Sequence, residues 1–182
     1  VIGTGKIGRV FADICRGFGM KVLAYDKFPN PNAGLDYVEL DELFEKSDVI
    51  SLHCPLTVET DHLIRSGSIR RMKDGVVIVN TSRGGLVNTE DLIQGLKSGK
   101  IGAACLDVYE EEGDVFYEDL SGHILQDDKL VRLIAMPNVI VTSHQAFLTK
   151  EALDNIAHTT VNNLRRFFEG DPDESTEVAF GK

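Results

Sequence analysis

The chain has 182 residues, of which 42% are hydrophobic, and it carries a net charge of −10. This length and apolar content suffice for one buried core, so we expect a single globular domain with appendages. The acidic balance argues against nucleic acid or an anionic membrane as a partner, because both need a basic surface, and no apolar run approaches the ~20 residues of a membrane span.

A glycine-rich turn, Gly3-Thr4-Gly5-Lys6-Ile7-Gly8, opens the chain and leads into a helical pattern. In a dinucleotide-binding turn, Gly3 permits the tight bend, Gly5 lets the backbone approach a pyrophosphate and Gly8 lets helix and strand pack closely. The free amides at the start of the helix then face the phosphates. The alternative is a turn without a ligand, and the elements that follow bear on that choice.

Residues 6–18 carry apolar side chains at spacings of three and four, which predicts an amphipathic helix that ends at Gly19. Residues 21–25 then predict a buried strand that closes on Asp26. This acid lies roughly 20 residues past the glycines, where a dinucleotide fold places the carboxylate that binds the ribose. A carboxylate there repels a 2′-phosphate and favours NAD over NADP. The alternative for Asp26 is a solvated turn residue.

Helices and strands alternate along the rest of the chain. Further helices are predicted over 40–47, 63–72, 88–98 and 149–168. Further strands are predicted over 48–54, 76–80, 101–106 and 139–142. The run 76–80 is apolar throughout until Asn80, as expected for a parallel strand covered on both faces. This alternation predicts an α/β fold with a doubly wound parallel sheet, a Rossmann-like domain over 1–146, and a C-terminal helix and tail over 147–182.

Three further features complete the pattern. Most carboxylates of the acidic segment 109–128 are expected to lie in a solvated loop, and the tail from Gly170 is expected to be frayed. Cys15, Cys54 and Cys105 show no metal-ligand spacing, so we expect reduced core cysteines of a cytoplasmic protein, without a disulfide or a metal site. Only two residues precede the glycine turn, so we expect the first strand to be truncated and the natural protein to extend upstream.

Four motifs occur in the order found in one protein family. They are Gly3-Thr4-Gly5-Lys6-Ile7-Gly8, Leu52-His53-Cys54-Pro55-Leu56-Thr57, Asn80-Thr81-Ser82-Arg83-Gly84 and Leu106-Asp107-Val108-Tyr109-Glu110. With them the chain resembles the D-isomer-specific 2-hydroxyacid dehydrogenases over residues 1–168. Through residues 109–112, 126–128 and 143–149 it is most similar to the fermentative D-lactate dehydrogenases. The substrate domain that precedes the glycine turn in that family has no counterpart here, so we expect little or no turnover by the chain alone.

The resemblance implies an oxidoreductase that transfers a hydride between NAD(H) and a small D-2-hydroxy acid or 2-keto acid, with D-lactate and pyruvate as the expected pair. It also implies a homodimer, since family members usually dimerise through this domain. It assigns the pyrophosphate to Gly5, Lys6 and Ile7 and the adenosine ribose to Asp26. It places Cys54, Pro55 and Thr60 along the cleft, and Thr81, Ser82 and Asp107 near the nicotinamide.

The family's catalytic set carries over onto Arg83, Glu112 and His144. Arginine offers a planar fork for the substrate carboxylate, histidine is a proton donor that works near neutral pH, and a glutamate can orient the imidazole. Each residue also has an alternative role without catalysis: Arg83 as a solvated loop residue, Glu112 as a surface charge and His144 as a core histidine. Only the register selects Glu112 from its neighbours Glu110 and Glu111. The other four histidines, His62 among them, are expected to be structural or exposed.

Two other functions stay open at this point. One is a non-catalytic, NAD(H)-sensing interaction protein of the same fold, and the other is a structural fragment without a ligand. The joint presence of Arg83, Glu112 and His144 favours the enzyme, because a sensor needs the glycines and Asp26 but no proton donor.

Overall fold

The computed structural model describes residues 1–114, 125–172 and 174–176. It contains two compact units, Val1–His144 and Gln145–Lys182. Two of the carboxylates expected in the solvated loop, Glu118 and Asp119, and the last six residues of the tail lie outside the described residues.

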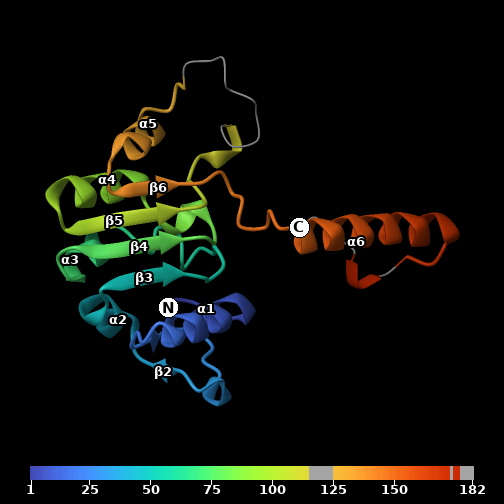
Figure 1. Cartoon of the computed structure of the whole chain (residues 1–182), viewed down its shortest axis with the longest axis horizontal. Coiled ribbons are helices and arrows are strands. Elements are labelled where there is room, and N and C mark those ends of the chain that lie inside the picture. Colours follow the sequence, from blue (N-terminus) through green and yellow to red (C-terminus); the bar gives the residue numbers. More distant parts are fainter. Residues whose placement is uncertain (115–124, 173, 177–182) are drawn as a thin grey trace. The chain divides into compact units, whose positions relative to one another are not determined.

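Parallel strands form the middle of the first unit (Figure 1). β3 (Val49–Leu52), β4 (Val76–Asn80), β5 (Ile101–Leu106) and β6 (Val139–Val141) form one parallel sheet in that order, and β1 (Leu23–Ala24) pairs in parallel with β2 (Asp36–Tyr37). Ile2 joins the two sheets through parallel bridges to Tyr25, which follows β1, and to Leu52. The predicted α/β fold with a parallel, Rossmann-like sheet is therefore confirmed.

Helices connect these strands. The α-helices are α1 (Lys6–Gly17), α2 (Leu40–Lys46), α3 (Ser66–Arg71), α4 (Thr89–Ser98), α5 (Asp128–Ala135) and α6 (Lys150–Glu169). Short 3₁₀ turns are η1 (Pro31–Ala33), η2 (Gly84–Leu86), η3 (Glu112–Asp114) and η4 (Glu174–Thr176). α4 begins and ends as predicted, because the Asn88 side chain accepts the amide of Asp91 and Gly99 closes the helix at φ 77°. The sequence pattern missed β2 and α5.

Part of the acidic segment differs from the solvated loop predicted for most of its carboxylates. Asp127 caps α5, since its side chain accepts the amides of Lys129 and Leu130. Glu110 is partly buried, and its contacts are described with the site below. An acid-rich stretch of sequence can therefore start a helix, because carboxylates are favourable at a helix N-terminus.

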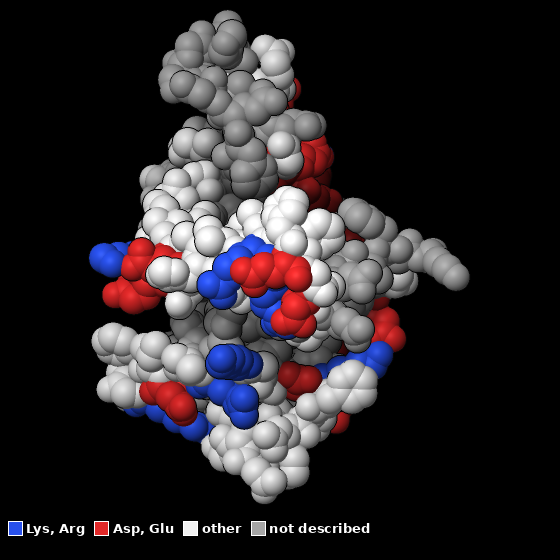
Figure 2. Space-filling model, turned by 90° about the vertical axis from the view of Figure 1, so that its right-hand side faces the viewer, with Lys and Arg blue, Asp and Glu red and all other residues white. Residues whose placement is uncertain are grey.

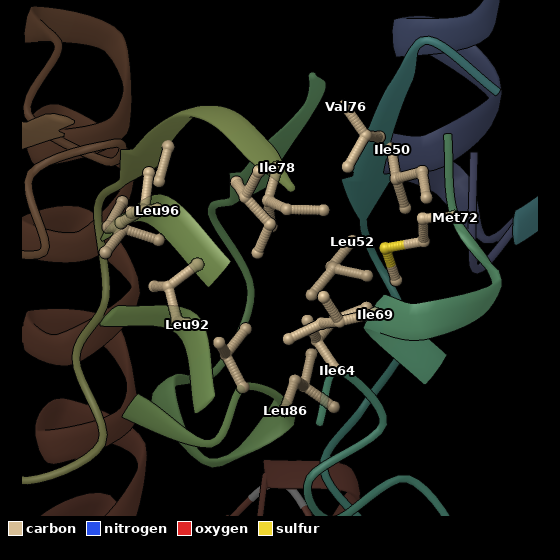
Figure 3. Packing of buried hydrophobic residues seen from close by; sticks show 14 of the residues in the cluster. Ile50, Leu52, Ile64, Ile69, Met72, Val76, Ile78, Leu86, Leu92 and Leu96 are labelled. Carbon is tan, nitrogen blue, oxygen red and sulfur yellow. The ribbon is translucent and has the colours of Figure 1, made fainter. Parts of the chain in front are cut away.

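Buried aliphatic side chains from β3, β4, α3 and α4 form the core of the first unit (Figure 3). Ile50, Leu52 and Ile78 from the strands pack with Ile69 of α3 and Leu92 of α4. Along β4, buried residues alternate with half-buried ones. One face of this strand is therefore fully buried, and the other, predicted to be covered as well, is partly buried.

The apolar stripe of α1 predicted the helix but not its buried face. Ile7 is 72% exposed and Val10 58%, whereas Gly8 and Ala12 are buried. Small side chains let this helix approach its neighbours closely, which leaves the larger ones outside.

The second unit and the surface add two observations. α6 has no buried residue. No helix in the described ranges is long and apolar enough to cross a membrane. Basic and acidic side chains lie side by side on the face shown in Figure 2.

Candidate cofactor and catalytic site

The carboxyl ends of the parallel strands lie at one edge of the sheet, where open α/β sheets bind ligands. The glycine turn lies at this edge. Gly3 has φ 92°, and a Cβ on it would lie 2.4 Å from the amide nitrogen of Cys54. A Cβ on Gly8 would lie 2.0 Å from the carbonyl oxygen of Gly3. Close packing of the turn thus requires both glycines. Gly5 differs, because no heavy atom lies within 4 Å of its Cβ position.

The space at Gly5 adjoins the start of α1. Gly5 is the N-cap residue, no side chain caps this end, and the first turn contains no acidic residue. A helix N-terminus carries a partial positive charge and amides that lack intrahelical partners. Open space beside uncapped amides fits the pyrophosphate of a dinucleotide.

Asp26 is fixed by the same turn. Its Oδ2 accepts hydrogen bonds from the amide of Thr4 at 2.6 Å and from the Thr4 hydroxyl at 2.9 Å, and its Oδ1 accepts from the amide of Phe28 at 2.9 Å. Burial raises the pKa of Asp26, but these three hydrogen bonds outweigh it, so the pKa lies below its ordinary value. Asp26 is therefore an anion whose position is fixed by the turn. A carboxylate has roughly four acceptor positions, which leaves room for a ribose hydroxyl.

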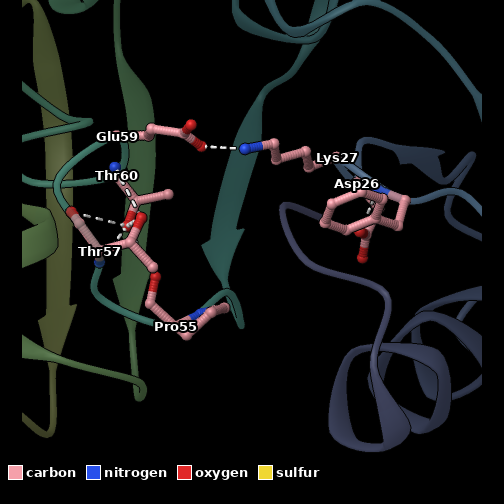
Figure 4. A network of polar contacts seen from close by, with 7 residues as sticks. Asp26, Lys27, Pro55, Thr57, Glu59 and Thr60 are labelled. Carbon is pink, nitrogen blue, oxygen red and sulfur yellow. Dashed lines mark hydrogen bonds and ion pairs between the residues drawn. The ribbon is translucent and has the colours of Figure 1, made fainter. Parts of the chain in front are cut away.

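The loop after β3 faces Asp26 across the sheet edge (Figure 4). Lys27 forms an ion pair with Glu59 of that loop. The Thr60 hydroxyl donates to the carbonyl oxygen of Pro55 at 2.7 Å and accepts from the amide of Thr57 at 2.8 Å. The loop is therefore a compact turn beside the ribose-binding candidate.

The ends of β3 and β4 are joined by hydrogen bonds. The Ser82 hydroxyl donates to the carbonyl oxygen of Cys54 at 2.7 Å, and the Asn80 side chain donates to the carbonyl oxygen of Arg83 at 2.9 Å. Burial raises the pKa of the Cys54 thiol to about 11, so this cysteine is protonated and unreactive at neutral pH. Thr81 and Arg83 are exposed at this edge.

The loop that carries Arg83 follows β4 and spans residues 82–88, and it is called the Arg83 loop below. It packs against the loop after β5. A Cβ on Gly84 would lie 2.0 Å from the carbonyl oxygen of Tyr109, so the two backbones are in direct contact. The Arg83 guanidinium donates to the carbonyl oxygen of Ser82 at 2.7 Å and is otherwise presented on the surface. The fold thus holds an exposed cation next to the segment that leads to Glu112.

Glu112 and His144 are hydrogen-bonded to each other. Glu112 Oε1 lies 2.9 Å from His144 Nδ1, and Glu112 Oε2 accepts the amide of Tyr109 at 2.9 Å. The side chains of Glu112 and His144 are 19% and 29% exposed. The His144 amide donates to the carbonyl oxygen of Asp107 at 2.7 Å, and the Asp107 carboxylate accepts the Thr142 hydroxyl. The imidazole is therefore held by side chain and backbone together.

The two neighbouring glutamates have other partners. Glu111 forms an ion pair with Lys129 at 2.9 Å. Glu110 Oε1 lies 2.6 Å from His62 Nε2, and its Oε2 accepts the amide of Thr89 at 3.0 Å. The sequence carried no signal for the partnership of His62, because the two residues are 48 positions apart. All three cysteines are free, and the described residues contain no group of His, Cys, Asp or Glu that could hold a metal ion.

Residues 1–146 match the family model for the D-isomer specific 2-hydroxyacid dehydrogenase, NAD binding domain. The D-lactate dehydrogenase of Escherichia coli is 52% identical over 174 residues, which are 94% of this chain and 53% of the relative. A crystal structure of a D-lactate dehydrogenase from Treponema pallidum has a TM-score of 0.91 at 39% identity, covering 98% of this chain and 54% of that one. A D-lactate dehydrogenase from Lactobacillus jensenii, crystallised with NAD⁺, has a TM-score of 0.86 at 34% identity, covering 98% and 54%.

The chain spans about half the length of these relatives. The family match covers the whole first unit, with the glycine turn, Asp26 and the Glu112–His144 pair. The chain therefore belongs to the D-isomer specific 2-hydroxyacid dehydrogenase family, and residues 1–146 form its NAD-binding domain.

Proposed function

We propose that this chain provides the cofactor-binding and proton-transferring half of an NAD-dependent oxidoreductase that interconverts a small 2-keto acid and its D-2-hydroxy acid. Pyruvate and D-lactate are the proposed pair, in line with the names of its relatives. The observation that carries the proposal is the hydrogen bond between Glu112 and His144. An NAD(H)-sensing protein needs the glycine turn and Asp26, but it has no use for a histidine held by a partly buried carboxylate.

In the proposed complex, the turn and the loops after the strands hold the cofactor. The amides of Lys6 and Ile7 bind the pyrophosphate in the space beside Gly5, while Gly3 and Gly8 give the turn its shape. Asp26 accepts the ribose hydroxyls. The remaining contacts come from Cys54, Pro55, Thr60, Thr81, Ser82 and Asp107. Bound NADH supplies the hydride, and the residues of the chain orient the reactants and move the proton.

Arg83 is proposed to bind the substrate carboxylate. Its guanidinium is exposed at the end of β4, and a planar fork can donate two parallel hydrogen bonds to a carboxylate. This contact fixes the keto acid and directs its carbonyl group, since the two groups are adjacent in the substrate. A lysine there would provide the charge without the paired geometry.

His144 is proposed to give the proton to the substrate oxygen that becomes the hydroxyl. Its Nδ1 is bonded to Glu112, so transfer to the substrate falls to Nε2. Glu112 is held in turn by the amide of Tyr109, which fixes the direction of the imidazole. In the oxidative direction the neutral imidazole takes the proton back.

A homodimer is also part of the proposal. Support comes from α1, whose Ile7, Val10 and Ile14 are more than half exposed. An apolar surface of this kind is typical of an association site. Light scattering of the purified chain over a range of concentrations measures the oligomeric state, and a monomer at all concentrations would contradict this part of the proposal.

Turnover is tested in a chimaera in which this chain replaces the matching half of the Escherichia coli D-lactate dehydrogenase. Reduction of pyruvate is followed by the loss of NADH. His144→Ala should lower the rate about 10²–10⁴-fold, the usual contribution of a positioned acid, with NADH affinity unchanged. An active chimaera whose rate is insensitive to His144→Ala would refute the assigned role, and a chimaera that folds, binds NADH and reduces no 2-keto acid would refute the proposed function.

A further inference from the structure

A second histidine–carboxylate pair lies beside the proposed site. His62 Nε2 is 2.6 Å from Glu110 Oε1, and the side chains are 33% and 22% exposed. Glu110 Oε2 accepts the amide of Thr89, the first residue of α4. Asp61 also faces the ring, at 3.8 Å from Nδ1. A single carboxylate thus joins the segment after β3, the start of α4 and the end of β5.

The backbone of His62 is bound to the loop that carries Arg83. Its amide donates to the carbonyl oxygen of Gly85 at 2.8 Å. Two residues further along, the amide of Ile64 donates to the carbonyl oxygen of Leu86 at 2.9 Å. The carbonyl oxygen of Ile64 accepts the amide of Asn88 at 2.9 Å. The segment 62–64 therefore runs alongside the segment 85–88, directly after Arg83.

The backbone before Glu110 supports the same loop from another side. Gly84 lies so close to Tyr109 that a Cβ would be 2.0 Å from its carbonyl oxygen and 2.6 Å from the amide nitrogen of Glu110. The Arg83 loop is therefore enclosed between the segments that carry the two members of the pair. The hydrogen bond between His62 and Glu110 connects these two segments to each other.

Two properties of the pair favour a fixed geometry. His62 has φ 48°, a left-handed backbone conformation that is uncommon for residues other than glycine. Burial raises the pKa of Glu110, but the hydrogen bonds from Thr89 and the contact with His62 outweigh burial and lower it. Glu110 is accordingly an anion at neutral pH and a strong acceptor.

We infer that His62 and Glu110 form a clamp that positions the Arg83 loop for the substrate carboxylate. The inference rests on the proposed role of Arg83. Both residues are positioning residues, because they act through the loop and touch neither cofactor nor substrate. Their contribution is a matter of geometry: a displacement of about 1 Å at a positioned group can cost on the order of 10²-fold in rate.

His62→Asn is the principal test variant. Asparagine tolerates the left-handed conformation but is too short to reach Glu110, and the bond from Thr89 to Glu110 is retained. His62→Gln is the rescue variant, since its amide can donate to Glu110. Glu111→Gln is the matched control, because it removes a neighbouring carboxylate that is paired with Lys129 instead.

Hydrogen exchange of the chain itself gives the first readout. In His62→Asn, exchange of amides in residues 82–88 should rise about tenfold, which corresponds to the loss of one charge-assisted hydrogen bond. His62→Gln should restore protection, and Glu111→Gln should not change it. Unchanged exchange in His62→Asn, or an equal rise throughout α1 and the core strands, would overturn the inference, because the pair would then be dispensable or merely stabilise the fold.

Kinetics of the chimaera give the second readout. His62→Asn should raise the KM for pyruvate on the order of tenfold, with NADH affinity unchanged. An active chimaera whose KM for pyruvate does not respond to His62→Asn would contradict the clamp. If the unmodified chimaera does not reduce pyruvate, the proposed function fails, and hydrogen exchange still decides whether the pair holds the loop.

Discussion

Replacing Gly5 by alanine should remove most of the affinity for NADH and leave the fold intact. Gly5 has φ −62° and ψ −165°, which alanine also adopts, and no heavy atom lies within 4 Å of the new Cβ. The methyl group would instead occupy the space proposed for the pyrophosphate. The variant therefore separates what the cofactor requires from what the fold requires.

The magnitudes follow from the surroundings of each glycine. At Gly5, alanine restricts the unfolded chain, which stabilises by about 0.4–1 kcal/mol, but it is a poorer N-cap residue by a similar amount. The midpoint of thermal unfolding should therefore move by less than about 2 °C. Gly8→Ala is the matched contrast, because its Cβ would meet the Gly3 carbonyl oxygen at 2.0 Å. It should cost about 2 kcal/mol or more, or roughly 4–8 °C.

The assay is fluorescence titration with NADH, together with thermal unfolding of the same samples. Loss of one charge-assisted hydrogen bond to a phosphate costs about 1.5–3 kcal/mol, so the Kd of Gly5→Ala should rise at least about tenfold. If Gly5→Ala binds NADH like the unmodified chain, the pyrophosphate does not lie at Gly5. If Gly8→Ala unfolds at an unchanged temperature, the close packing of the turn does not constrain the fold.

Three further predictions concern single residues. The folded-state pKa of Asp26 lies below its ordinary 3.8, so Asp26→Asn should lower stability at pH values above about 4, and the difference should vanish as the pH falls further. Urea unfolding measures this effect. The same variant should weaken NADH binding, which fluorescence titration measures. Burial lowers the pKa of His53 from 6.5 to about 4. Between these two pH values the unfolded chain binds more protons than the folded chain, so stability should rise with pH there. His53→Gln should flatten that rise in urea unfolding, and an unchanged slope would contradict the assignment. Asn88→Ala removes the cap of α4 and should cost about 1 kcal/mol, which a denaturation midpoint equal to that of the unmodified chain would refute.

The elements that the sequence predicted best are those with a local cause. α4 follows from the Asn88 cap and the Gly99 stop, and β4 from a continuous apolar run. The short strand β2 has no such cause, because it exists through its pairing with β1. Helix α5 was hidden among acidic residues, although Asp127 is a regular N-cap. Periodicity also did not show which face of α1 is buried, since that depends on how closely Gly8 lets the helix approach the turn.

Residue types and their positions in the sequence indicated the candidate site residues, but not the hydrogen bonds and ion pairs that these residues form. The sequence placed Asp26, Arg83 and His144 at ends of strands, where the structure also has them. It could not choose among three adjacent glutamates on physical grounds, because their partners come from distant segments. In the structure Glu110 meets His62, Glu111 meets Lys129 and Glu112 meets His144. Whether these contacts serve catalysis stays a prediction.

His144 is the last residue of the first unit, and its ring and amide are bonded to Glu112 and Asp107, which come earlier in the chain. The backbone of His144 is left-handed, at φ 52°. Glu112 and Asp107 both lie in the segment that follows β5, so the imidazole is anchored to the parallel sheet of the first unit. If His144 is the proton donor, as proposed, the donor and the nucleotide turn belong to one folded unit, which sets the distance between them.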